Sequence, residues 1–315
     1  MKEFSLYKFY KRYGLFVILA LLIIIFAIAT PRFITPTNLM NILRQISMFG
    51  IVVVGYTMVM VSGGCDMSVG GQLALCGMFA AQLTVNMGVP TPVAIILTLA
   101  LGALFGLLNG LLMNTFNIMP IIVTLGTMLI FQGASYVISG GVAIYGLPDS
   151  MKWLGQGYIG PIPTPVVLLV VVCLLGYVFL HKTYYGRQIF AIGGNLEAAR
   201  LAGIKIKKVR LTVFTITGVL AALAGMVMAG RTGSAQPSAG SSYPFDCMTA
   251  VVLGGVSFAG GSGSIMGAMM GVLIIGVLNN GMQLIGMDAN EINCIKGLVL
   301  LIAIGIDSYQ RKQGS

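Results

Sequence analysis

Charged side chains are scarce in this sequence. Asp, Glu, Lys and Arg together make up 8% of its 315 residues, whereas 57% of the residues are hydrophobic. A soluble globular protein carries about 25% charged residues, so this chain has too few charges to cover a surface that faces water. Its 43 glycines suit close packing between membrane helices. The composition therefore predicts an all-α, polytopic integral membrane protein without a soluble domain large enough to have its own core.

The side chains that catalysis and metal binding require are also few. The chain has one histidine, eight acidic residues and five scattered cysteines without a CxxC pair. These residues suggest no nucleophile–base pair, paired carboxylate site or metal-ligand cluster. A GxxxxGK[ST] phosphate-binding loop is absent as well. We therefore expect a non-catalytic protein without a metal site or a cofactor of its own. If ATP drives its work, another polypeptide hydrolyses the ATP.

Long apolar runs indicate how often the chain crosses the membrane. About 20 apolar residues span the roughly 30 Å hydrocarbon layer. The eighth run is short and bounded by glycine pairs, which leaves open whether it spans the membrane or re-enters from one side. No linker rich in Pro or Ser divides the chain, so residues 1–315 are predicted to form a single transmembrane domain. The runs predict about ten transmembrane helices, near residues 14–30, 40–62, 69–87, 92–113, 119–138, 164–180, 211–229, 245–258, 265–286 and 292–306.

Basic residues predict the orientation of these helices. Most of the 18 lysines and arginines lie before the first apolar run, in the loop 181–210, and at the C-terminal end. Cytoplasmic segments are enriched in Lys and Arg, so both termini and this loop are predicted to be cytoplasmic. The loops 139–163, with Trp153 and Tyr158, and 231–243 then lie outside. This topology accounts for the net charge of +10 without a nucleic-acid partner. The terminal basic residues are Lys2, Lys8, Lys11, Arg12, Arg311 and Lys312.

Polar side chains within the apolar runs are candidates for a transport pathway. A buried amide costs free energy unless it is paired, so these amides either pair with neighbouring helices or line a wet passage for an uncharged, hydroxylated solute. The carboxylate of Asp66 is interpreted either as a helix N-cap or as a pathway residue. The scarcity of intramembrane carboxylates disfavours an ion-coupled secondary transporter. The candidate pathway residues are Asn41, Gln45, Asp66, Ser68, Asn279, Asn280 and Gln283.

A very short helix is predicted inside the basic loop. Asn195 suits an N-cap, residues 196–202 suit a two-turn helix, and Gly203 suits its end. Glu197 lies in the first turn, where an acidic group complements the helix dipole. A helix of this length is unstable alone in water. We therefore expect it to dock on the membrane domain or on a partner.

Four stretches carry a family resemblance. Residues 193–204 read Gly-Gly-Asn-Leu-Glu-Ala-Ala-Arg-Leu-Ala-Gly-Ile, which resembles the coupling loop of bacterial ABC-transporter permeases of the ribose type. Residues 62–70 read Ser-Gly-Gly-Cys-Asp-Met-Ser-Val-Gly and resemble that family's Gly-x-Asp-Leu-Ser-Val-Gly segment, with Met67 in place of the usual Leu. Residues 235–246 and 250–281 resemble two further segments. The resemblance runs in order from about residue 14 to 306.

The resemblance implies a permease subunit of an ATP-binding cassette importer in the bacterial inner (plasma) membrane. Its solute would be a monosaccharide, such as a ribose-like pentose or a hexose, or a related polyol. Permeases for nucleosides or branched-chain amino acids are the alternatives within this class. The implied partners are a cytoplasmic ATPase that holds ATP and Mg²⁺, an extracytoplasmic sugar-binding protein, and a second permease copy, commonly in a homodimer. The implied ATPase-coupling residues are Gly193, Gly194, Asn195, Glu197, Ala198, Arg200 and Gly203.

Overall fold

The computed structural model describes the backbone of residues 6–314 and the side chains of residues 14–309. Lys2 lies outside the described backbone, and the other terminal basic residues lie outside the described side chains. Within this range each of the ten apolar runs forms a helix, and three further short helices lie between these ten. The helices are α1 (Leu6–Ala29), α2 (Pro36–Val61), α3 (Val69–Ala81), α4 (Thr91–Phe116), α5 (Pro120–Ser139), α6 (Asp149–Gln156), α7 (Thr164–Tyr177), α8 (Tyr184–Gly194), α9 (Leu196–Leu201), α10 (Ile206–Thr232), α11 (Tyr243–Leu253), α12 (Ile265–Leu284) and α13 (Ala289–Gly314).

Shorter elements complete the chain. A 3₁₀ turn precedes α2 (η1, Pro31–Ile34), and π-helical turns extend α3 (η2, Gln82–Asn86) and α7 (η3, Val178–Lys182). Four two-residue strands form two antiparallel pairs. They are β1 (Ile144–Tyr145) with β4 (Ser234–Ala235), and β2 (Tyr158–Ile159) with β3 (Ile162–Pro163). The fold is that of an all-α, polytopic membrane protein, as the composition predicts.

Local sequence determines where many of these helices begin and end. The side chain of Thr35 accepts a hydrogen bond from the amide of Asn38 and caps α2. Proline occupies the first turn of α2, α4, α5, α7 and α11, where its fixed φ favours the helix and its missing N–H costs nothing. At the other ends, Asn117 after α4, Gly140 after α5 and Gly233 after α10 adopt left-handed conformations that stop the helix.

Not every predicted span is a full-length helix. Seven helices in the described range are long and apolar enough to cross a membrane: α2, α4, α5, α7 with η3, α10, α12 and α13. The apolar part of α1 is Gly14–Ala29, and α11 has 11 residues. At about 1.5 Å per residue, α11 reaches only about half of the hydrocarbon layer. The number of ten spans therefore stays a prediction.

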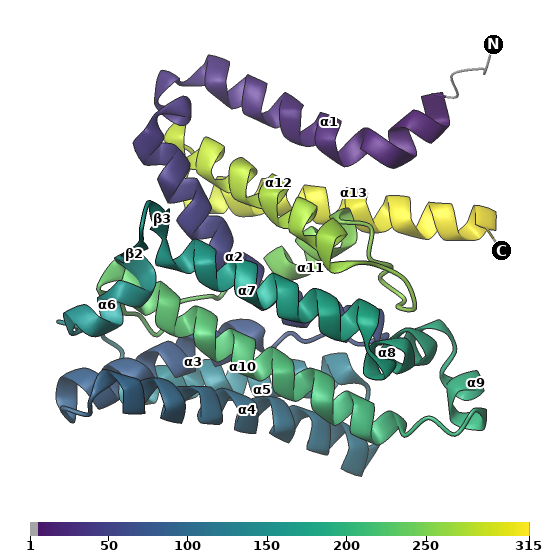
Figure 1. Cartoon of the computed structure of the whole chain (residues 1–315), viewed down its shortest axis with the longest axis horizontal. Helices are drawn as coiled ribbons and strands as arrows, with labels where there is room; N and C mark the ends of the chain where they lie inside the picture. Colours follow the sequence, from purple (N-terminus) through teal and green to yellow (C-terminus); the bar gives the residue numbers. More distant parts are fainter. Residues whose placement is uncertain (1–5, 315) are drawn as a thin grey trace.

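Helix α10 lies at the centre of one half of the bundle and packs against α2, α3, α4 and α6 (Figure 1). Glycines make its contact with α4 close. A Cβ on Gly102 of α4 would overlap the carbonyl oxygen of Gly218 on α10, and a Cβ on Gly218 would overlap that of Gly102. The high glycine content thus serves helix packing, as predicted.

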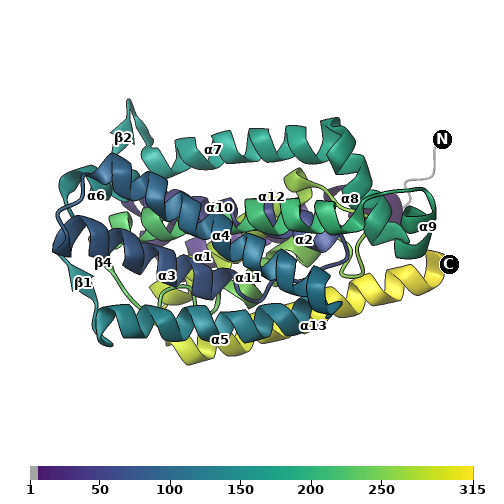
Figure 2. The same cartoon turned by 90° about the horizontal axis from the view of Figure 1, so that it is seen from below.

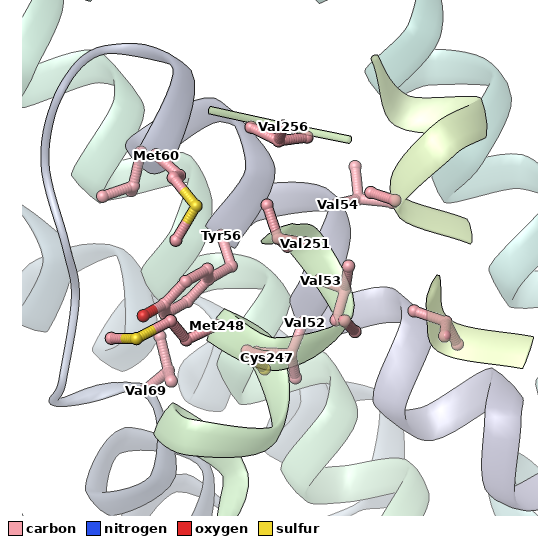
Figure 3. Packing of buried hydrophobic residues seen from close by; sticks show 14 of the residues in the cluster. Val52, Val53, Val54, Tyr56, Met60, Val69, Cys247, Met248, Val251 and Val256 are labelled. Atoms are coloured by element: carbon pink, nitrogen blue, oxygen red, sulfur yellow. The ribbon is translucent and has the colours of Figure 1, made fainter. Parts of the chain in front are cut away.

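The core of the other half lies between α2 and α11. Figure 3 shows Val53 and Tyr56 of α2 against Cys247, Met248 and Val251 of α11. Helix α2 is buried on every side from residue 46 to 61, which fits its lack of a polar face. Helix α11 is buried from residue 246 to 252. The short eighth segment therefore lies inside the protein rather than in lipid.

The two ends of the bundle carry different loops (Figures 1 and 2). Helix α6 and the β2–β3 pair lie at one end, and α8 and α9 lie at the other. The loops 139–163 and 231–243, both predicted to be outside, are hydrogen-bonded to each other through β1 and β4. Helix α1 begins, and α13 ends, at the end where α8 and α9 lie (Figure 1). The relative placement of these segments agrees with the topology that the charges predict.

Candidate functional site

Two irregular segments, each leading into a short helix, meet inside the bundle. Residues 62–68 run without helix from the end of α2 to the start of α3, and residues 236–242 lead into α11. A Cβ on Gly70 of α3 would overlap the carbonyl oxygen of Gly240 and lie 3.0 Å from Cδ of Pro244. The first turns of α3 and α11 are therefore in direct contact. Irregular backbone at membrane depth is tolerated where protein or a water-filled cavity covers it. Residues 65–68, Pro237 and Gly240 are buried, whereas Gly63, Gln236, Ser238 and Ser241 are exposed.

The chain from β4 through α11 to Gly261 crosses the bundle with only part of its length in a helix. Before α11, β4 pairs with β1 at the end where α6 lies (Figure 2). After it, the amide of Gly261 donates a hydrogen bond of 2.9 Å to the carbonyl oxygen of Val61, at the end of α2. The segment thus links opposite ends of the molecule and does not return to its starting side. Of the two alternatives left open by the sequence, the fold matches a crossing segment.

A buried polar network surrounds Asp66. Its Oδ1 accepts hydrogen bonds from the amide and the hydroxyl of Ser68, at 2.9 and 2.5 Å. The side-chain amides of Gln72 and Asn109 donate to Oγ of Ser68 at 2.7 and 2.8 Å. All four residues are fully buried. The network joins the segment before α3 to α4, and it brings together two predicted pathway residues, Asp66 and Ser68.

The interpretation of Asp66 as an N-cap is wrong. Helix α3 begins at Val69, and Ser68 occupies the N-cap position without a capping bond from its side chain. Asp66 instead closes a turn with Ser68, one of the local bonds that Asp side chains make outside helices. The error arose because the spacing of two residues fits both a cap and such a turn. The contribution of Gln72 could have been foreseen, since it lies one helical turn after Ser68.

Helix α5 holds both irregular segments in place. The hydroxyl of Thr124 accepts a hydrogen bond of 3.1 Å from the amide of Met67 and lies 3.2 Å from the carbonyl oxygen of Cys65. Further along α5, Gln132 and Ser135 donate from their side chains to the carbonyl oxygen of Pro237. These bonds satisfy backbone groups that no helix pairs. Movement of α5 would therefore move both segments.

A second polar cluster contains an ion pair. Nζ of Lys296 on α13 lies 3.0 Å from Oδ2 of Asp246 on α11, and the side chains are 13% and 9% exposed. The hydroxyl of Ser242 donates to the same oxygen. Charges inside spans are expected to pair, so the sequence contained the signal for this pair. Beside it is a cavity of about 40 Å³, lined by Gln45, Ile46, Phe49, Tyr243, Asp246, Gly276 and Asn279.

The other predicted pathway residues lie in different surroundings. Asn280 of α12 forms two reciprocal side-chain hydrogen bonds with Asn38 of α2, at 2.9 and 3.0 Å. This pairing matches the alternative in which amides join helices. Asn41 and Gln283 are exposed, whereas Gln45 and Asn279 share the cavity described above. The seven candidate pathway residues therefore lie at several separate sites rather than along one surface. Their contact with a solute stays a prediction.

The short helix of the basic loop forms as predicted. Helix α9 spans Leu196–Leu201, and Oδ1 of Asn195 accepts a hydrogen bond of 2.9 Å from the amide of Ala198. Gly203 follows with φ of +77°, which suits a glycine. Glu197 and Arg200 are exposed and lie 3.3 Å apart. The preceding helix α8 was not foreseen, because its glycines and mixed composition resemble a loop.

Glycines connect this loop to the end of α2 and to the chain that follows α11. A Cβ on Gly193 would overlap the carbonyl oxygen of Val61 and lie 2.5 Å from the amide nitrogen of Gly261. A Cβ on Gly260 would lie 2.7 Å from Cα of Gly63. Gly63 begins the segment that leads to Asp66, and residues 260–261 follow α11. The junction of α8 and α9 is therefore in van der Waals contact with the chain that leads from α2 to α3 and with the chain that follows α11.

Comparison with known proteins defines the class. Residues 38–304 match the family described as branched-chain amino acid transport system / permease component. The ribose import permease protein RbsC of Bacillus subtilis is 43% identical over 94% of this chain and 92% of its own length. The corresponding protein of Escherichia coli K12 is 41% identical over 93% of both chains. The fructose import permease protein FrcC of Rhizobium meliloti is 36% identical over 94% of this chain and 85% of its own. No solved structure matches the chain.

The chain belongs to the family of permease components of binding-protein-dependent transport systems, since the family model and these relatives cover nearly all of it. It is a multi-pass protein of the bacterial inner membrane. Membership in this family implies an ATPase and a substrate-binding protein as partners.

Proposed function

We propose that the chain imports a monosaccharide, a ribose-like pentose or a hexose, or a related polyol, as the permease subunit of an ATP-driven importer. The observation that carries this proposal is the identity of 41–43% to ribose import permeases along almost the whole chain. Xylose and galactose import permeases of Haemophilus influenzae also match, at 32% and 36% identity. The family description names branched-chain amino acids, and this solute class and nucleosides are the alternatives that the experiment below separates.

The polar cluster on α11 and α13 suits a solute with hydroxyl groups. Gln45 and Asn279 offer amide donors and acceptors beside the Asp246–Lys296 pair, and sugar hydroxyls can exchange hydrogen bonds with such groups. The cavity of about 40 Å³ has room for only a few water molecules, since one water needs about 10–15 Å³ of such volume. It is too small for a sugar, so the pathway needs a rearrangement or a surface shared with a second copy. A homodimer supplies that second copy.

Helix α9 is proposed to dock in a cleft of the cytoplasmic ATPase. Its side chains Glu197 and Arg200 are exposed, and so short a helix gains stability from a partner. ATP and Mg²⁺ would be bound by that ATPase and not by this chain. Closure of the ATPase would push on Gly193 and, through Gly63 and residues 260–261, on the segment that leads to α3 and on the chain that follows α11.

The experiment is uptake of a panel of radiolabelled pentoses, hexoses, nucleosides and branched-chain amino acids by cells that lack this gene. The cells are complemented with the wild type, with Glu197→Arg, or with Asp149→Arg. Asp149 forms an exposed pair with Lys152 at the same sequence spacing but on α6, so its variant controls for charge reversal. We expect uptake of one sugar to return with the wild type and the control but not with Glu197→Arg. Uptake of an amino acid or nucleoside instead would overturn the sugar assignment, and normal transport by Glu197→Arg would overturn the coupling role.

A further inference from the structure

A groove lies where α4 ends, α9 ends and α10 begins. It encloses about 520 Å³, far more than the cavity at Asp246. Asn114 and Asn117 form the α4 side of the groove. The side-chain amide of Asn114 donates a hydrogen bond of 2.9 Å to the carbonyl oxygen of Lys207, which ties this wall to α10. The lining residues are Asn114, Asn117, Leu196, Arg200, Ile204, Lys205, Ile206, Lys207, Lys208 and Arg210.

The lining is basic. Five of the ten residues are Lys or Arg, and none is acidic. Arg200 pairs with Glu197 on the exposed side of α9, whereas none of the other four has an acidic partner within 4.0 Å among the described side chains. Several like charges around one groove repel each other. An anion in the groove would relieve this repulsion.

The groove also has an apolar border. Phe116 and Met119, next to the groove's asparagines in sequence, are 65% and 67% exposed, and Leu201 beside Arg200 is 87% exposed. Arg210 directly precedes the apolar stretch with which α10 enters the bundle. The charges therefore lie at the depth where a membrane helix passes from the headgroup layer into hydrocarbon. A ligand that fits has a negative head and apolar tails.

We propose that this groove binds the phosphodiester headgroup of an anionic phospholipid, with the acyl chains beside Phe116 and Met119. Basic pockets at the cytoplasmic ends of membrane helices suit such headgroups. An acidic surface of the ATPase is the other possible source of negative charge. The membrane is favoured because the basic residues adjoin exposed apolar side chains of α4 and the start of a span, which a soluble partner does not need.

The test uses the purified full-length permease in detergent and measures lipid binding by native mass spectrometry. The probes are phosphatidylglycerol, phosphatidylcholine and soluble glycerol phosphate. The groove variant is Lys205→Gln with Lys208→Gln. The matched control is Lys182→Gln with Arg187→Gln, because these residues lie on or next to α8, carry the same charge, and face the rings of Tyr177 and Tyr184 rather than the groove. Thermal unfolding of each variant verifies the fold.

We expect the wild type to prefer phosphatidylglycerol over phosphatidylcholine. The groove variant, which lacks two basic residues, should lose about thirtyfold in affinity for phosphatidylglycerol, and the control should change less than twofold. Replacement by arginine at 205 and 208 should restore binding. Equal losses in both variants, no preference for the anionic lipid, or equally tight binding of glycerol phosphate would overturn the proposal. Unchanged lipid binding with lost ATPase association would assign the groove to the ATPase and overturn it as well.

Discussion

Asp66 and its neighbours illustrate how a single carboxylate can order a buried backbone segment. Four hydrogen bonds converge on two atoms, Oδ1 of Asp66 and Oγ of Ser68, which accept from Ser68, Gln72 and Asn109. None of these residues is exposed. Water therefore cannot replace a lost partner, and each donor left unpaired costs the full free energy of its burial.

Replacing Asp66 tests this role. We expect Asp66→Ala to lower the free energy of unfolding by about 2 kcal/mol, because the amide and hydroxyl of Ser68 lose their acceptor. Asp66→Asn retains an acceptor oxygen in the same place and should lose less than half as much. Thermal unfolding in detergent compares the variants. Equal losses for Ala and Asn would show that the negative charge, and not the acceptor, stabilises the segment.

Gly193 and Gly194 allow a matched comparison within one helix. A Cβ on Gly193 would overlap the carbonyl oxygen of Val61, whereas a Cβ on Gly194 would have no atom within 4 Å. We expect Gly193→Ala to reduce transport at least tenfold, because its contacts with Val61 at the end of α2 and with Gly261 after α11 must shift, and Gly194→Ala to transport normally. Uptake and ATP hydrolysis are measured together. Transport by Gly193→Ala at the wild-type rate would show that this contact does not convey motion.

At the scale of elements, α3 and α11 are the unusual parts of the bundle. Each is short, buried and preceded by an irregular segment, and the first turn of α3 at Gly70 touches Gly240 just before α11 and Pro244 in the first turn of α11. Helix α13 packs against α11, but almost all of its apolar length lies outside the core. The pair between Lys296 and Asp246 is the ionic link between these two helices. It stabilises α13 against the body of the protein.

Breaking this pair should destabilise the protein. Lys296→Met leaves the Asp246 carboxylate buried without a counter-charge, and we expect a loss of about 3 kcal/mol. The double variant Lys296→Met with Asp246→Leu removes both charges and should recover most of that loss. Unfolding of the single and double variants in detergent gives the coupling energy. If the loss of unfolding free energy in the double variant equals or exceeds the sum of the losses in Lys296→Met and Asp246→Leu, the two charges do not stabilise each other in the folded protein.

At the scale of the whole molecule, two opposite ends have separate tasks. One end carries α6 and the two strand pairs, and the other carries α8 and α9 (Figures 1 and 2). Gly193, at the end of α8, makes the close contacts with Val61 and Gly261. The proposed import requires the first end to face the sugar-binding protein and the second to face the ATPase. The basic residues of the loop 181–210 predict the same orientation.

Labelling of cysteines from outside the cell tests this orientation. We expect a membrane-impermeant maleimide to label Asp149→Cys in intact cells and Glu197→Cys only after the membrane is permeabilised. Both positions are exposed in the fold, so accessibility depends on the side and not on burial. Cys294 is exposed on α13, and the unsubstituted protein is therefore labelled in parallel. Labelling of both variants from outside would contradict the predicted topology.

The sequence alone determined the class of the protein, the ten apolar runs that become helices, and α9 with its cap at Asn195. These features depend on hydropathy and on neighbours within about four residues, which a sequence displays directly. Only the tertiary structure decided which polar groups meet. Asn38 and Asn280 pair across 242 positions, and Lys296 pairs with Asp246 across 50. Such contacts depend on how the helices pack, and single-sequence periodicity specifies which face of a helix is polar but not which helix lies opposite.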